Sequence, residues 1–387
     1  MHALLFERSW VGGKRCWRLP KCVYSAGRKV SVSTREKGVL RQGAILFALG
    51  SSLFVGFILL GQVSWGQDQM PEPVPLIFDT DLGNDVDDAM ALALIHALQS
   101  RNECRLLAVT LTKDNVYAAR FVELMNTFYG RPDIPIGMVR GGSHPEEGRY
   151  IRRVAEAEDS GILRYPHRLR SREEVPEATQ VLRRVLASQP DRSVVIVQVG
   201  FSTNLARLLV SQPDDISPLD GRALAEQKVR LLSVMAGAFS EELQAKNFVE
   251  FNVRGDIPAA QKLFADWPTE IVVSGFEIGV AIAHPAQSMQ LDYRFVRHHP
   301  LREAYDYYRG LANDQPTWDL TAVLYAVRPQ HGYFNLSPPG WVNVDDRGRT
   351  HFRRDEAGKH RYLIATPQQI IRVREAQALL CSQPPCR

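Results

Sequence analysis

The segment VPLIFDTDLGNDVDDAMALAL, residues 74–94, decides the fold class and indicates where the functional site lies. The apolar run VPLIF (74–78) predicts a buried strand, and AMALALIHAL (89–98) predicts a helix that is apolar nearly all round. Between these two runs, five aspartates occur within ten positions: Asp79, Asp81, Asp85, Asp87 and Asp88. Ligands of open α/β sheets bind beyond the carboxyl ends of strands, so these acids are the first candidates for a site.

The same alternation of short apolar runs and amphipathic stretches continues along the chain. Further strands are predicted at 105–111, 135–139, 193–200, 229–237 and 270–278, and further helices at 116–130, 173–188 and 258–266. Uninterrupted apolar strands are typical of a parallel sheet that is covered on both faces. Residues 140–173 are charged and aperiodic, which predicts a surface loop or lid, and residues 341–365 alternate strand-like runs with Asp/Gly turns. The sequence therefore predicts an α/β fold: a Rossmann-like, mostly parallel central sheet with helices on both faces, plus a small C-terminal antiparallel meander.

Residues 1–70 differ in composition from the rest and predict a basic leader. Residues 1–41 hold ten Lys or Arg and two Glu, and the seventeen residues 44–60 carry no charge. A basic stretch, an apolar core and a small-residue exit are typical of a secretory signal, here with cleavage near Gly66. Seventeen apolar residues also reach the lower limit for spanning a bilayer, so a membrane anchor through residues 44–60 is the alternative. Either way we expect an exported protein, periplasmic, secreted or membrane-anchored, whose functional domain is residues 71–387.

The formal charge of +4 comes from this leader, because residues 42–387 sum to −4. A mildly acidic body gives no electrostatic reason to expect a nucleic acid as a partner. The 45% hydrophobic content is enough for a sizeable core, which excludes a disordered or collagen-like protein. Cys381 and Cys386 flank SQPP near the C-terminus, and the sequence leaves open whether they form a disulfide.

The crowded acids predict a metal site. Five carboxylates so close together repel one another unless a cation neutralises them, and oxygen ligands select a hard ion such as Ca²⁺ or Mg²⁺. Capping of the following helix would explain one Asp but not five. An EF-hand loop is excluded because its sixth and twelfth positions would be Asn84 and Met90. The D-x-D after a strand also resembles the haloacid dehalogenase superfamily, although Gly83 stands where that motif has Thr or Val. A Mg²⁺-dependent phosphatase is therefore one alternative function.

The same segment resembles the opening of the calcium-dependent nucleoside hydrolases, the inosine–uridine-preferring family, whose hallmark is D-x-D-P-G-x-D-D-A. Further segments agree with the family in order: LLAVTL followed by Asn115, VQVGFSTNLA (197–206), FVEFNVRGDIPAA (248–260) and PTWDLTAVLYAVRP (316–329). The resemblance implies a hydrolase that cleaves the N-glycosidic bond of ribonucleosides to ribose and free base with a Ca²⁺-bound water. The expected partners are a small-molecule nucleoside and, in a homo-oligomer, further copies of the chain.

The resemblance also implies roles for individual residues. Asp81 would bind Ca²⁺ and act as the catalytic group that orients the attacking water. The other metal ligands would be Asp88, Asp319 and the backbone carbonyl of Val199. Ribose or base would be held by Asp87, Asn115, Glu250, Asn252 and Trp318. For Glu250 and Asn252 the alternative is a solvated loop.

Two departures from the family pattern bear on the site. The acidic loop has two extra residues and Leu82 in place of Pro, and a gapped alignment assigns Asp87 and Asp88, rather than Asp85, to the closing D-D. Trp318 stands where many members have a His before the late Asp, and the purine-preferring branch has Trp there, which stacks on the base. This favours purine nucleosides; the alternative for Trp318 is a residue that only covers the core. An exported ribose- or nucleoside-binding protein without catalysis is the other alternative function.

Overall fold

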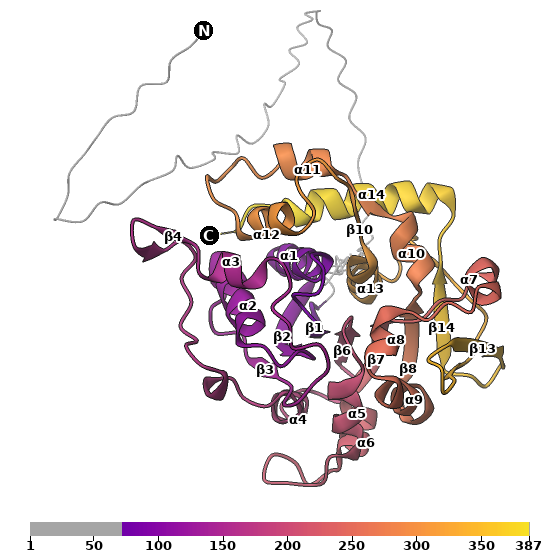
Figure 1. Ribbon diagram of the computed structural model, residues 1–387. Coiled ribbons are helices and arrows are strands. Elements are labelled where there is room, and N and C mark those ends of the chain that lie inside the picture. Colours follow the sequence, from indigo (N-terminus) through magenta and orange to yellow (C-terminus); the bar gives the residue numbers. More distant parts are fainter. Residues whose placement is uncertain (1–71, 387) are drawn as a thin grey trace, which may run out of the picture. The chain divides into compact units, whose positions relative to one another are not determined.

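The computed structural model describes residues 72–386 (Figure 1). The predicted leader, with its apolar residues 44–60, lies outside the described residues. Within the described part, no helix is long and apolar enough to cross a membrane.

A central sheet organises the chain, as predicted, and its strands follow the order β13-β12-β14-β8-β7-β6-β1-β2-β3. Every neighbouring pair from β14 to β3 is parallel. The parallel strands are β1 (Val74–Thr80), β2 (Cys104–Leu111), β3 (Ile136–Met138), β6 (Val194–Gln198), β7 (Val229–Met235), β8 (Glu270–Ser274) and β14 (His360–Ile364). Most of these strands are buried on both faces, which explains their uninterrupted apolar sequences.

Strand β1 lies where the direction of the chain through the sheet reverses. It pairs with β2 on one side and with β6 on the other, so the chain first runs outward to β3 and then returns to build the other half. Such a switch point leaves a crevice at the carboxyl ends of the central strands. The acidic loop after β1 therefore begins at the position where α/β sheets bind ligands.

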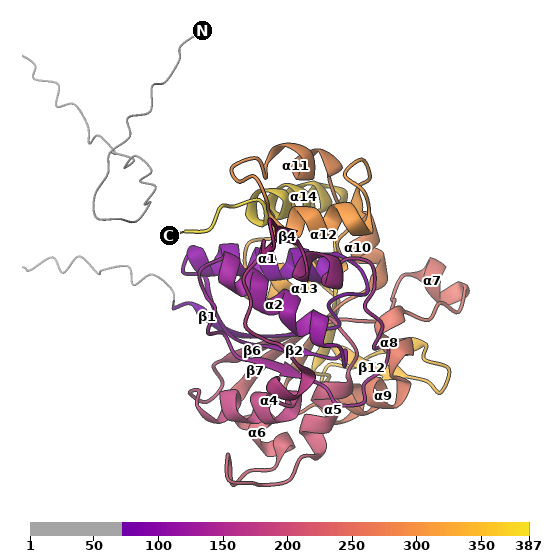
Figure 2. The ribbon, with the colours of Figure 1, turned by 60° about the vertical axis from the view of Figure 1, so that its left-hand side comes forward.

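Helices cover both faces of the sheet, as Figure 2 shows. One layer consists of α1 (Asp87–Ser100), α2 (Val116–Phe128) and α13 (Trp318–Val327), with α12 (Pro300–Tyr308) and α14 (Pro367–Cys381) packed on α1 outside it. The other contains α4 (Ala178–Ala187), α5 (Thr203–Val210), α6 (Gly221–Lys228) and α9 (Ile257–Asp266). Two hydrophobic clusters correspond to these layers.

Helix α1 is buried over almost its whole length, from Asp87 to Leu98. It packs on β2 and against α13 and α14, so neighbours surround it on several sides. A helix enclosed in this way needs no polar face, which explains its apolar sequence. Cys381, in α14, donates its thiol to the carbonyl of Met90 in α1, and Cys381 and Cys386 are both free thiols.

The C-terminal strands are present but are arranged differently from the predicted meander. Strand β12 (Gly340–Val344) pairs with β13 (Thr350–Arg354) and, at one position, with β14, both antiparallel. Strand β14 also pairs in parallel with β8, and the short β11 (Asn335–Leu336) lies on β14. The C-terminal strands therefore extend the central sheet, because β8 offers them a free edge. The strand predicted at 270–278 ends at Ser274, and α10 (Phe276–Ala281) follows it.

Residues 140–173, predicted as a loop or lid, contain the helix α3 (Ile151–Ala155), the hairpin β4 (Glu158–Asp159) and β5 (Ile162–Leu163), and a 3₁₀ turn at Arg172–Glu174. Residues 144–150, which we call the strap, lie against the acidic loop. The hydroxyl of Tyr150 donates to the carbonyl of Asp85 (2.7 Å), and Asn115 Nδ2 donates to the carbonyl of Pro145 (2.7 Å). A Cβ on Gly148 would lie only 1.9 Å from the carbonyl oxygen of Gly83. The strap and the acidic loop are therefore in direct backbone contact.

The close approach of the strap predicts a difference between two glycines of the same region. Gly148 (φ +66°) and Gly141 (φ +62°) have similar backbones, but a Cβ on Gly141 would meet nothing within 4 Å. We expect Gly141→Ala to cost about 1–2 kcal/mol, the ordinary penalty of a left-handed residue. Gly148→Ala should cost roughly 1–3 kcal/mol more, because the strap must move. Urea unfolding of both variants measures the difference, and equal losses would show that the contact is not tight.

Candidate active site

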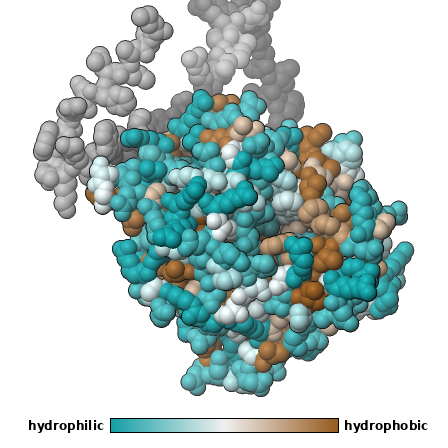
Figure 3. Space-filling model, in the orientation of Figure 1, coloured by the Kyte–Doolittle hydropathy of each residue, from teal (hydrophilic) through white to brown (hydrophobic). Residues whose placement is uncertain are grey.

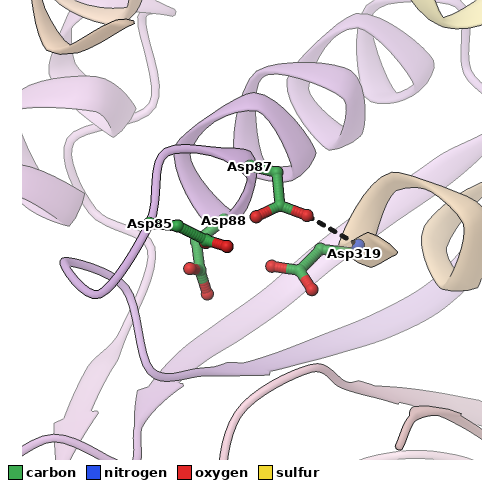
Figure 4. A group of neighbouring side chains, drawn as sticks. All are labelled: Asp85, Asp87, Asp88 and Asp319. Carbon is green, nitrogen blue, oxygen red and sulfur yellow. Dashed lines mark hydrogen bonds between the residues drawn. The ribbon is translucent and has the colours of Figure 1, made fainter. Parts of the chain in front are cut away.

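Four carboxylates converge at the carboxyl edge of the sheet (Figure 4). Asp85, Asp87, Asp88 and Asp319 each offer an oxygen atom, and these four atoms all lie within 4.8 Å of one another. Asp85 comes from the acidic loop, Asp87 and Asp88 from the first turn of α1, and Asp319 from the first turn of α13. We call these four residues the acidic cluster.

Hydrogen bonds hold the cluster together. Asp87 Oδ2 accepts hydrogen bonds from the backbone N–H groups of Trp318 (2.9 Å) and Asp319 (3.1 Å). It thereby satisfies N–H groups at the start of α13 that have no acceptor within the helix. Asp88 Oδ1 accepts from the hydroxyl of Thr80 at the end of β1. Residues more than 200 positions apart in the sequence are thus joined directly.

The first two aspartates of the segment have different surroundings. Asp79 is fully buried, and its Oδ1 accepts from Thr110 Oγ1 (2.5 Å) and Asn204 Nδ2 (2.8 Å), which fixes β1 to β2 and α5. Asp81 lines a cavity beside the acidic cluster, and its Oδ2 accepts from Asn84 Nδ2. Asp79 therefore supports the sheet, whereas Asp81 faces the site.

Burial raises the pKa of four carboxyl groups at the site: Asp81, Asp87, Asp88 and Asp319. The pKa of Asp81 rises to about 6, first because the group is buried and then because Asp85 is negative. The pKa values of Asp87, Asp88 and Asp319 lie well above the usual range, because burial and then the neighbouring carboxylates disfavour their charged forms. The site therefore lacks enough positive charge to stabilise all of these groups in their ionised form. Because every available ligand atom is oxygen, the missing positive charge fits a hard divalent cation.

A cavity of about 230 Å³ opens beside the cluster. Its lining combines polar residues, which are Asp81, Asn84, Asp85, Glu250, Asn252 and Asp319, with apolar and aromatic residues, which are Val199, Met235, Phe251, Phe276, Tyr308 and Trp318. On this side of the molecule, apolar surface gathers over α8 (Phe251–Gly255) and α10 (Figure 3). A cavity lined by both carboxylates and aromatic rings suits a ligand with a polyhydroxylated part and a flat ring.

Glu250 and Asn252 lie at the start of α8, inside the molecule. The carboxylate of Glu250 caps this helix by accepting from the N–H groups of Asn252 (2.8 Å) and Val253 (3.1 Å), and burial raises the pKa of Glu250 to about 7. Asn252 Nδ2 donates to the carbonyl of Val199 (2.7 Å). Since both residues are buried and line the cavity, the alternative that they form a solvated loop is wrong.

Asn115 does not reach the cavity. It is the N-cap of α2: its Oδ1 accepts from the N–H of Tyr117 (2.8 Å), while its Nδ2 holds the strap. Asp114 pairs with Arg172 (2.6 Å) at the surface. The structure therefore corrects the predicted ribose contact at Asn115. The side chain that is buried after β2 is Lys113.

Trp318 is fixed in the wall of the cavity. Its Nε1 donates to the carbonyl of Phe276 (3.0 Å), and the rings of Trp318 and Phe276 stack with centroids 5.5 Å apart. A Cβ on Gly279 would lie 2.2 Å from Trp318 Cδ1, so only glycine fits beneath the indole. Trp318 both packs on α10 and presents surface to the cavity.

Sequence reasoning missed several residues of this site. Asp85 was visible in the acidic segment, but the gapped alignment set it aside. Asn84 and Tyr308 line the cavity without belonging to any recognised motif, and Phe276 was assigned to a strand. The fully buried position of Lys113 had no signal in the sequence, because a Lys after a strand is ordinarily solvated.

Comparisons with known proteins agree with this arrangement. A profile described as inosine-uridine preferring nucleoside hydrolase matches residues 76–374. An uncharacterized protein of Schizosaccharomyces pombe is 29% identical over 197 residues, 49% of this chain and 57% of that protein, so the match spans little more than half of that relative. The pyrimidine-specific ribonucleoside hydrolase RihA of Klebsiella pneumoniae is 26% identical over 295 residues, 71% of this chain and 86% of that protein. The structure of an inosine-uridine preferring nucleoside hydrolase from Bacillus anthracis shares the fold, with a TM-score of 0.60 at 15% identity over 80% of this chain and 99% of that one.

The raised pKa values predict how the stability of the metal-free protein depends on pH. Folded Asp81 holds its proton up to about pH 6, whereas unfolded Asp releases it near its usual value of 3.8. The contribution of Asp81 to stability is complete below its pKa in the unfolded chain, 3.8, and is lost as the pH rises through its pKa in the folded protein, about 6. We expect chelator-treated protein to lose on the order of 3 kcal/mol through Asp81 alone between about pH 4 and 7.

Thermal unfolding at several pH values, with and without a divalent cation, measures this effect. Asp81→Asn should flatten the profile of the metal-free protein, because its side chain does not titrate. A metal-free protein that gains stability between pH 5 and 8 would contradict the expected sign.

Proposed function

Because the chain belongs to the family of inosine-uridine preferring nucleoside hydrolases, which hydrolyse the N-glycosidic bonds of nucleosides, we propose that it releases the base from ribonucleosides with the aid of Ca²⁺. One observation carries this proposal: the acidic cluster adjoins a cavity whose lining includes the aromatic rings of Phe251, Phe276, Tyr308 and Trp318. Ribose hydroxyls and a flat nucleobase are the two parts that such a cavity would accommodate.

The donor set supports Ca²⁺ as the ion. Asp81, Asp88, Asp319 and the carbonyl of Val199 would hold it, and Asp85 adds a carboxylate that the family motif does not include. A bound Ca²⁺ supplies positive charge that lowers the pKa of water and favours hydroxide as the nucleophile. Asp81 would act as the general base that accepts the proton of the attacking water.

The remaining polar residues would hold the sugar. Asp87, Glu250 and Asn252 are fixed by backbone hydrogen bonds, so they are already oriented before a nucleoside binds. Cleavage passes through a transition state in which positive charge develops on the ribose, as in glycoside hydrolysis. The carboxylates around the sugar would stabilise that charge.

The base would lie against the aromatic residues of the lining, and we propose a preference for purines. The indole N–H of Trp318 is occupied by the carbonyl of Phe276, so it does not serve as a donor to the base. A purine stacked on aromatic rings would take its proton from solvent on its own ring nitrogen. The relative from Klebsiella pneumoniae is described as pyrimidine-specific, so the base preference needs a direct test.

The leader supports the further proposal that the protein is exported, with the signal removed near Gly66 or kept as an anchor through residues 44–60. We also propose a homo-oligomer. Mass spectrometry of the mature N-terminus and light scattering of the purified protein test these two points.

Loss of the metal ligands should abolish base release. We expect chelation, Asp88→Asn or Asp319→Asn to lower kcat/KM for inosine on the order of 100-fold or more, because the cluster would no longer neutralise the cation. Asp292→Asn, at an exposed position, is the matched control. Release of reducing sugar in the presence of Ca²⁺ is the measurement.

Three results would count against this function. Full activity in the presence of a chelator would remove the metal from the reaction. Nucleoside binding without any hydrolysis would favour the non-catalytic binding protein, and Mg²⁺-dependent release of phosphate from a phosphomonoester would favour the dehalogenase-like phosphatase.

The proposed stacking predicts a selective effect at Trp318. We expect Trp318→Ala to raise KM for inosine about tenfold or more, since stacking of a base on an aromatic ring contributes roughly 1–3 kcal/mol. Uridine, with its smaller ring, should be affected less. Trp318→Phe should keep most of the preference. Equal losses for both nucleosides with Trp318→Ala would show that the indole only maintains the fold.

A further inference from the structure

Lys113 is a buried cation next to a site that otherwise carries negative charge. It follows β2 at the same edge of the sheet as the acidic loop, and its side chain is fully buried. Its Nζ donates one hydrogen bond, to the carbonyl of Glu146 in the strap (2.7 Å). Burial of an ammonium group costs free energy unless opposite charges lie near.

The opposite charges near Lys113 belong to the site. Asp81, Glu146 and Asp88 are the acids whose negative charges favour the protonated form of Lys113 and oppose the lowering of its pKa by burial. In return, the charge of Lys113 lowers the pKa of Asp81. Within residues 72–386 Lys113 forms no direct ion pair with a carboxylate. Its place beside the site follows from the backbone: the N–H of Thr112 donates to the carbonyl of Thr80 (2.9 Å), so Lys113 and Asp81 directly follow two hydrogen-bonded residues.

The electrostatic balance of the site follows from these neighbours. Six carboxyl groups line the cavity or belong to the cluster: Asp81, Asp85, Asp87, Asp88, Glu250 and Asp319. The ammonium of Lys113 offsets part of their repulsion when the site holds no ion. It must also repel any cation that enters, because like charges at short range in a poorly solvated site interact strongly.

We propose that Lys113 is the built-in counter-ion of the acidic cluster: it stabilises the metal-free site and lowers its affinity for the divalent cation. This inference rests on the cation site of the proposed function. Lys113 does not touch the nucleoside cavity, since it is absent from the residues that line the described cavity. Lys113 is therefore a positioning residue, which changes cation binding through the electrostatic effect of its ammonium group on the metal ligands.

Lys113 also holds the strap, so the experiment must separate its charge from its hydrogen bond. Lys113→Met removes both, and Lys113→Arg keeps the charge. Tyr150→Phe removes only the neutral hydrogen bond between the strap and the carbonyl of Asp85, and so serves as the control for a loosened strap.

Calorimetric titration of chelator-treated protein with Ca²⁺ alone, at neutral pH and low salt, measures the affinity without any activity assay. We expect Lys113→Met to bind Ca²⁺ about tenfold more tightly than the wild type, or better, and Lys113→Arg to bind with nearly wild-type affinity. Without Ca²⁺, Lys113→Met should unfold at a lower temperature than the wild type, and saturating Ca²⁺ should remove most of that difference.

Unchanged or weaker Ca²⁺ binding by Lys113→Met would overturn the inference while leaving the proposed function intact. The same holds if Tyr150→Phe gains as much affinity as Lys113→Met, because the effect would then come from the strap. If the wild type itself binds no Ca²⁺, the metal-dependent function fails together with the effect on affinity.

Discussion

The hydrogen bonds from the start of α13 to the carboxylate of Asp87 are the link on which the site depends. These bonds hold the start of α13, with Asp319, next to Asp87 and Asp88 of α1, although the negative charges of these residues repel one another. A carboxylate at a helix N-terminus is stabilised by hydrogen bonds from the free N–H groups and by the helix dipole. This stabilisation offsets the repulsion between Asp87 and the neighbouring acids. The cavity wall formed by Trp318 follows from the same link, because this residue provides one of the two amides.

Much of the fold could be predicted because β1 and β6 contain uninterrupted apolar runs and β2 and β7 are mostly apolar, as is typical of buried parallel strands. The pairing of β14 with β8 could not be predicted in this way. These strands are about ninety residues apart, and their register depends on the edge that the rest of the sheet leaves open. The end of β8 was also misjudged, since Phe276 and Ile278 continue an apolar pattern that a strand and a helix share.

Site residues could be predicted where the strand or helix that carries them sets their place. They could not be predicted where the side chain can point in more than one direction. Asp81, Asp319, Val199, Glu250, Asn252 and Trp318 all line one cavity, although they come from distant segments. Asn115 was misplaced because two residues after a strand can point in different directions: Asn115 caps α2, and Lys113 turns inward. The position of Asp85 depends on the path of a loop with two extra residues, which no spacing rule specifies. Tyr308 enters from α12, whose sequence carries no recognisable signal.

The packing of α1 on α14 affects how the polypeptide can mature. Helix α1 is the first of the domain and is apolar nearly all round, yet one of its covers is α14, which ends at Cys381. During synthesis from the N-terminus, α1 emerges well before the segment that will enclose it. Its hydrophobic surface therefore stays accessible to chaperones until α14 has been synthesised and has packed on it. A folding intermediate that lacks α14 would expose this surface, and exposed apolar surface makes intermediates prone to aggregation.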